Sequence, residues 1–110
     1  MVTSTVTSPE RQTPRLLLEL GVQPRLLGFR QLCVGIDRYS AGDILSMSKE
    51  LYPYIGELTG CSAASVEHSI RYTITDAWNR RDPEVWGQYF PDAAKIPSNK
   101  EFIAILTICQ

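Results

Sequence analysis

The sequence predicts an all-α fold of about six helices, with a helix-turn-helix at its centre. Apolar residues recur at helical spacing in most segments, and no segment shows the two-residue period of a strand. Glycine and proline divide the chain into short helical segments. At 110 residues, of which 44% are hydrophobic, the chain is long enough to bury one core without disulfides or metals.

The N-terminal segment differs in composition from the rest of the chain. Residues 1–12 are rich in Ser and Thr, which is typical of a flexible arm. We therefore expect an arm over residues 1–12 and one helical domain over residues 13–110. The arm lacks the apolar core of a signal peptide, and no run of residues approaches the roughly 20 apolar residues of a membrane span.

Start and stop signals locate the first two helices. Thr13 followed by Pro14 indicates the start of a short helix, which Gly21 ends. Pro24 interrupts the chain before a second helix over residues 27–39. The apolar side of this second helix is expected to hold Phe29, Leu32, Ile36 and Tyr39.

A third helix is expected over residues 44–59, with Asp43 as its cap. Pro53 lies inside this segment, so we expect a kink or a break near Leu51. The residues expected to face the core are Leu45, Leu51, Ile55 and Leu58.

Residues 51–78 predict the helix-turn-helix. Gly56 is the small residue that two closely packed helices need at their contact, and Gly60 suits the sharp turn that follows. Ser62 is the expected N-cap of a second helix over residues 63–79. The apolar stripe of that helix is expected to contain Val66, Ile70, Ile74, Ala77 and Trp78.

The opposite side of the second helix carries small, polar and aromatic groups. Because the second helix of such a motif enters the DNA major groove, this side suits groove contacts. The alternative is an ordinary amphipathic helix pair within a bundle. The residues on this side are Ser65, His68, Tyr72 and Thr75, with Arg71 at its edge.

The C-terminal third predicts two further helices. Asp82 followed by Pro83 caps a short fifth helix, and a loop covers residues 91–97. Ser98 or Asn99 then starts the last helix. The short helix is expected to contain Val85, Trp86, Tyr89 and Phe90, and the core of the last helix Phe102, Ile103, Ile105 and Leu106.

The last helix is apolar on almost all sides, so it is expected to be buried on more than one side. It either packs centrally in the monomer or presents one side to a partner chain. We favour a dimer contact because the helix is terminal and has few neighbours in sequence. The residues expected at this contact are Phe102, Ile105 and Leu106.

The charge balance is not that of a typical DNA-binding domain, which is basic overall or on one face. The net charge is −1 and the isoelectric point is about 5.8. Any basic face must therefore be local, and the same residues would also fit an ordinary solvated surface. The candidates are Arg25, Arg30, Arg71, Arg80 and Arg81.

The sequence offers no support for an enzyme, a cofactor or a metal site. It contains no Gly-rich phosphate loop, no suitably spaced carboxylate pair and no nucleophile elbow. Cys33, Cys61 and Cys109 lack metal-ligand spacing, and His68 is the only histidine. An odd number of cysteines without a C-x-x-C motif favours reduced thiols in a cytoplasmic protein.

The motifs LYPYI, SAASVEHSIRYTI, AW and SNKEFIAI occur in this order. Together they resemble the C-terminal effector domain of stage zero sporulation protein A, a bacterial response regulator, over residues 20–106. The resemblance implies an all-helical domain that binds short direct repeats in promoters and forms dimer contacts through its C-terminal helix. The receiver domain of that regulator fits no part of this sequence. If Met1 is the natural start, phosphorylation of a fused receiver cannot regulate the chain.

The resemblance also identifies departures on the recognition helix. Ser65 and His68 stand where the family has arginines, and Tyr72 stands where it has a histidine. Glu67 and Arg71 are kept. A bidentate arginine–guanine pair contributes about 1–3 kcal/mol of discrimination. The replacements therefore imply an altered target sequence, a lower affinity or loss of DNA binding.

These features predict a DNA-binding transcriptional regulator that reads the major groove with helix 63–79. We expect backbone amides near Ser62 to hold a phosphate. The alternative is an interaction module that no longer binds DNA and dimerises with, or modulates, a related full-length regulator. A homodimer is expected on repeated half-sites. The predicted DNA contacts are Ser62, Ser65, Glu67, His68, Arg71 and Tyr72.

Overall fold

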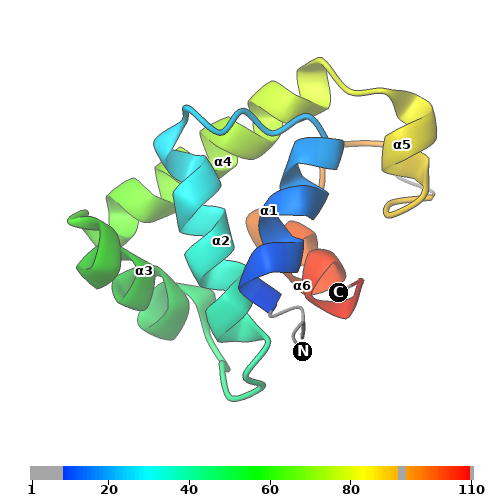
Figure 1. The fold of residues 1–110 in the computed structure, drawn as a ribbon. Coiled ribbons are helices and arrows are strands. Elements are labelled where there is room, and N and C mark those ends of the chain that lie inside the picture. Colours follow the sequence, from blue (N-terminus) through cyan, green and yellow to red (C-terminus); the bar gives the residue numbers. More distant parts are fainter. Residues whose placement is uncertain (1–8, 92–93, 110) are drawn as a thin grey trace, which may run out of the picture.

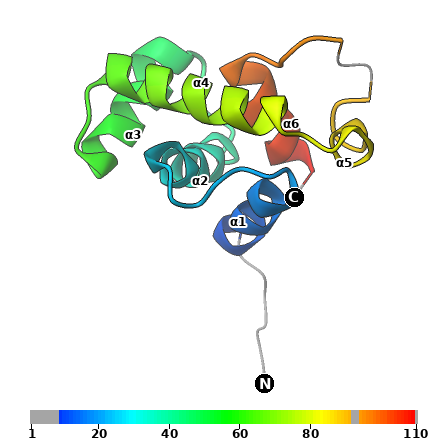
Figure 2. The ribbon, with the colours of Figure 1, turned by 90° about the horizontal axis from the view of Figure 1, so that it is seen from above.

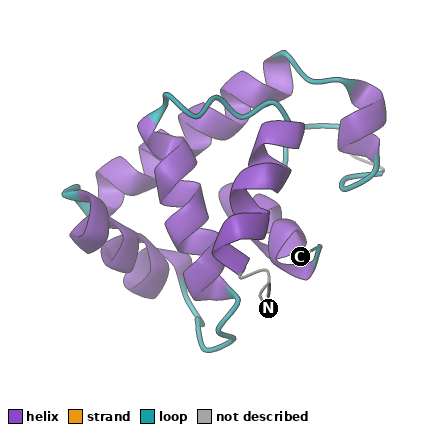
Figure 3. Cartoon of the chain, in the orientation of Figure 1, coloured by secondary structure: helices purple, strands orange, loops and turns teal. Residues whose placement is uncertain are grey.

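The structure, a computed structural model, describes residues 9–91 and 94–109, which are helical with connecting loops and contain no strand (Figure 3). The predicted all-α class is confirmed. The elements are α1 (Pro9–Glu19), α2 (Leu27–Tyr39), a π-helical turn η1 (Met47–Leu51), α3 (Tyr52–Thr59), α4 (Ala63–Asn79), α5 (Pro83–Gly87) and α6 (Asn99–Ile108).

Helix α2 is the central element of the fold (Figure 1). It contacts α1, α3, α4 and α6. Figure 2 shows α4 on one side of α2 and α1 on the other. Helix α4 packs on α2, α3 and α6, and the side chains on its other side, including His68 and Tyr72, are exposed.

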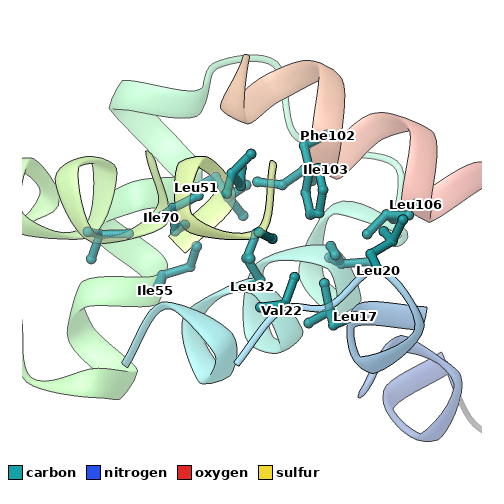
Figure 4. Packing of buried hydrophobic residues seen from close by; sticks show 14 of the residues in the cluster. Leu17, Leu20, Val22, Leu32, Leu51, Ile55, Ile70, Phe102, Ile103 and Leu106 are labelled. Carbon is teal, nitrogen blue, oxygen red and sulfur yellow. The ribbon is translucent and has the colours of Figure 1, made fainter. Parts of the chain in front are cut away.

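The core fills the space between these helices. Its side chains come from α1, α2, η1, α3, α4 and α6, and Figure 4 shows how they converge. Leu32, Ile36, Leu51 and Ile55 are buried as predicted. Trp86, from α5, is also buried, and its indole N–H donates to the Leu20 carbonyl at 2.9 Å. This bond ties α5 to the end of α1.

Helix α1 begins at Pro9, which is earlier than the start signal at Thr13. Pro14 lies inside the helix and lacks the N–H that would complete the backbone ladder. Burial of Leu17 and Leu20 against the core supports the helix around this gap. Residues 1–8 of the expected arm lie outside the described residues, and residues 9–12 belong to α1.

An irregularity was predicted near Leu51, and the chain changes there from the π-helical turn η1 to the α-helix α3, with Pro53 in the first turn of α3. The chain stays helical through this point, so the helix changes its winding rather than breaking. The predicted start at Ile44 is wrong. Ser46 is the cap of η1 and accepts from the Lys49 N–H at 3.1 Å. The predicted cap, Asp43, instead forms an ion pair with Arg38.

Two residues expected in the core of this segment are exposed. Leu45 is 90% exposed because it precedes the cap and never enters the helix. Leu58 is 51% exposed. Helix α3 packs through Tyr52, Ile55 and Gly56, and Leu58 lies to one side of this strip on the helix surface.

The C-terminal elements follow the predicted signals. Asp82 caps α5 by accepting from the Glu84 N–H at 2.9 Å. Ser98 and Glu101 form a reciprocal capping box at the start of α6. Helix α5 ends at Gly87, so Tyr89 and Phe90 follow it rather than lying within it as predicted.

Candidate nucleic-acid interface

The turn between α3 and α4 depends on two glycines. Gly60 ends α3 with φ +75°, a left-handed conformation that glycine adopts without steric strain. A Cβ at Gly56 would lie only 2.3 Å from the carbonyl oxygen of Cys61, whose N–H donates to the Gly56 carbonyl. The predicted need for a small residue here is confirmed. Its closest contact is the turn backbone rather than the second helix.

Ser62 caps α4 as predicted. Its hydroxyl oxygen accepts from the Ser65 N–H at 3.1 Å, and the helix begins at Ala63. The Ala63 and Ala64 amides lie in the first turn of the helix, where no helical carbonyl lies four residues before them to accept their hydrogen bonds. They are therefore the donors that this end of the helix offers to an anion.

Helix α4 has one buried and one exposed side. Its buried residues are Val66, Ile70, Thr73, Ile74 and Ala77. Trp78, predicted for the same stripe, is half-buried and packs edge-on against Trp86 with ring centroids 5.6 Å apart. The exposed side carries Ser65, His68, Arg71 and Tyr72, as predicted, with Thr75 partly buried beside them.

The buried side of α4 lies directly against α2 at Gly28. A Cβ at Gly28 would meet the Thr73 hydroxyl and the Ser69 carbonyl oxygen, so only glycine allows this approach. This contact was not among the predicted ones. A glycine inside a helix is unfavourable by about 1 kcal/mol relative to alanine. The position of Gly28 in a predicted helix was therefore the one sequence signal for a close contact there.

Two buried polar side chains, Asn99 and Gln31, form hydrogen bonds to the helix-turn-helix. Asn99, at the start of α6, donates from Nδ2 to the Tyr52 hydroxyl at 3.2 Å and to the Glu67 carbonyl at 3.1 Å. Gln31 of α2 donates from Nε2 to Thr59 Oγ1 at 3.5 Å and to Cys61 Sγ at 3.7 Å. These contacts link α6 and α2 to both helices of the motif and to its turn. Sequence spacing alone gave no signal for either.

The charged groups of α4 are paired within the chain. Arg71 donates to Glu67 at 3.1 Å, one helical turn away, and both side chains are largely exposed. Exposed pairs of this kind contribute about 0–1 kcal/mol, so Arg71 is easily released to another partner. Arg71 is the one guanidinium on the exposed side of α4.

The other end of α4 is held by a second network. Asp76 accepts from Arg80 at 2.7 Å and from Gln23 at 2.8 Å, and these hydrogen bonds lower the pKa of the Asp76 carboxyl. Arg80 also donates to the Gly21 carbonyl at 2.8 Å. Arg80 therefore anchors the loop after α1 rather than extending the basic side of α4.

The structure thus contains a tight helix-turn-helix. The second helix, α4, packs on α2 with its apolar side and exposes its polar side. The chain matches the family model described as "Sporulation initiation factor Spo0A C terminal" over residues 13–108. It belongs to this family. The Spo0A C-terminal domain is a helical, non-catalytic DNA-binding domain that serves as the transcriptional-activator part of a bacterial sporulation regulator.

Two of the three predicted dimer residues on the C-terminal helix lie in the core of the monomer. Phe102 and Leu106 are fully buried in the monomer core, and Ile105 is only partly exposed. Helix α6 packs on both α2 and α4. These helices are far from α6 in sequence, so the contacts could not be predicted from local patterns. Packing within the monomer therefore explains why Phe102 and Leu106 are apolar, without a partner chain.

The Cys33 side chain is partly buried. Burial raises the pKa of the Cys33 thiol to about 11, so it is protonated at neutral pH. Across the described residues, no three His, Cys, Asp or Glu side chains are grouped to hold a metal ion. None of the described helices combines the length and apolarity needed to cross a bilayer.

Proposed function

We propose that this chain is a DNA-binding transcriptional regulator that places α4 in the major groove. The observation that carries the proposal is the open face of α4, held at a tight glycine turn and supported from behind by α2. A helix presented in this way fits the major groove, which is about 12 Å wide. Such a role places the protein on promoter repeats in the bacterial cytoplasm.

The exposed residues suggest distinct roles in DNA binding. Arg71 reaches a guanine edge or a phosphate once it leaves Glu67, and Glu67 accepts from a cytosine amino group or orients Arg71. Ser65, His68 and Tyr72 set the base preference from the same side. The Ala63 and Ala64 amides near Ser62 hold a phosphate at the start of α4.

Selection of random duplex DNA by the purified protein, followed by anisotropy titrations at two salt concentrations, tests this proposal. We expect an enriched motif that is bound more tightly than random DNA, with affinity that falls as salt rises. Equal, weak binding to all sequences would contradict sequence-specific recognition by α4.

Replacing Arg71 with alanine is expected to weaken binding to the selected motif by about ten-fold, the lower end of the range for an arginine–guanine pair. The salt dependence should become shallower if the contact is to a phosphate. Arg15→Ala on α1 is the matched control, because α1 lies on the far side of α2 from α4. Equal affinities of the two variants would remove Arg71 from the interface.

A second candidate function is supported by the charge pairing on α4. Arg71 is paired with Glu67, and Arg80, just after α4, is paired with Asp76, so α4 offers few free positive charges. This favours an interaction module that contacts a second copy or a related regulator.

Of the predicted dimer residues, Ile105 has exposed surface, and Ile108, next to it at the end of α6, is 77% exposed. Sedimentation analysis of an Ile108→Asp variant tests the dimer, which this change should dissociate.

A further inference from the structure

A groove runs along one flank of α4, beside its exposed face. Helix α4 lines it together with the segment from Lys95 to Lys100, and residues at the start of η1 also line it. Its volume is about 820 Å³. Figure 2 shows the start of α6 lying next to α4. Three cationic side chains line the groove: Arg71 from α4, with Lys95 and Lys100 opposite.

Helical geometry connects this groove to the exposed face. Successive residues of an α-helix are about 100° apart, so Glu67, Arg71 and Thr75 share one side of α4. These three residues line the groove, while His68 and Tyr72 continue around the helix onto the open face. Arg71 therefore lies at the border between the groove and that face.

The two lysines are available to an external anion. Both are exposed, and within the described residues neither forms an ion pair. Of the two carboxylates that line the groove, Glu67 is paired with Arg71. Glu101 accepts from the Ser98 N–H at 2.8 Å and keeps its negative charge, since this hydrogen bond and the nearby charge of Lys95 both lower the pKa of its carboxyl. The three cationic side chains still outnumber the two carboxylates along the groove.

We propose that Lys95 and Lys100 contact the phosphate backbone of the DNA duplex whose major groove receives α4. This inference rests on the proposed function. A helix in the major groove has a phosphate strand on either side of it, and the groove places the two lysines along one flank of α4. Their contacts fix the orientation of the domain on DNA and carry no sequence information.

Anisotropy titrations over a range of salt concentrations test the proposal with the selected motif and with random DNA. Each neutralised phosphate contributes about 0.9 to the slope of log affinity against log salt concentration. The double variant Lys95→Ala/Lys100→Ala is therefore expected to lower the magnitude of the slope by about two. Affinity should fall by the same factor on both DNAs, so the preference for the motif is kept.

Two controls accompany this experiment. Arg15→Ala removes one positive charge far from α4 and should leave the slope unchanged, and the charge-preserving Lys95→Arg/Lys100→Arg variant should retain it. A double alanine variant with the wild-type slope, alongside salt-dependent wild-type binding, would overturn the lysine contacts and leave the proposed function intact. Wild-type protein that binds neither DNA overturns both.

Discussion

Replacement of Phe102 with alanine is expected to lower the free energy of unfolding by about 3–5 kcal/mol, the usual effect of truncating a fully buried phenylalanine. Phe102 has no exposed surface and stacks on Phe90 with ring centroids 5.7 Å apart. Its ring also lies 5.9 Å from that of Trp86. The cavity would therefore open where α6 meets the turn after α5. Urea denaturation followed by circular dichroism measures the loss.

Ile105→Ala is the matched control for this change, because Ile105 lies on the same helix but is only partly buried. We expect a clearly smaller loss of stability for this variant. The comparison also separates the two interpretations of α6. If Phe102→Ala kept its stability and instead dissociated a dimer, the residue would belong to a contact between chains and not to the monomer core.

Replacement of Gly56 with alanine is expected to destabilise the fold by about 1–3 kcal/mol, as overpacking usually does. The new methyl group would lie 2.3 Å from the Cys61 carbonyl oxygen, a backbone atom that cannot rotate away. The turn must open to relieve the clash, and α4 must shift with it. We therefore also expect weaker DNA binding under conditions in which the variant is fully folded, as measured by anisotropy.

Gly87→Ala provides the comparison for Gly56→Ala. A Cβ at Gly87 meets no atom within 4 Å, and its φ angle is negative, so this change should be neutral or stabilise by up to about 1 kcal/mol. Thermal unfolding of both variants distinguishes a steric effect from a general effect of losing glycine. Equal stabilities would show that the turn accommodates a side chain at Gly56.

The sequence determined the elements whose signals are local. The Ser62, Asp82 and Ser98 caps lie within a few residues of the amides that they accept from. Ser62 and Asp82 were predicted as caps, and Ser98 was one of two candidates for the start of α6. The bounds of α2 and α4 were also predicted, since helical periodicity is a property of one segment. The polar side of α4 followed from the same period. The family followed from the order of short motifs, and the match over residues 13–108 confirmed it.

Only the tertiary structure decided which apolar and polar groups meet across the fold. It placed Phe102 and Leu106 in the monomer core, because α6 packs on α2 and α4. It left Leu45 exposed before the cap of η1, and Leu58 exposed because α3 packs through Tyr52, Ile55 and Gly56. It also brought Lys95 and Lys100 beside α4. These outcomes depend on contacts between residues far apart in sequence, whereas a periodic pattern specifies only which side of its own helix is apolar.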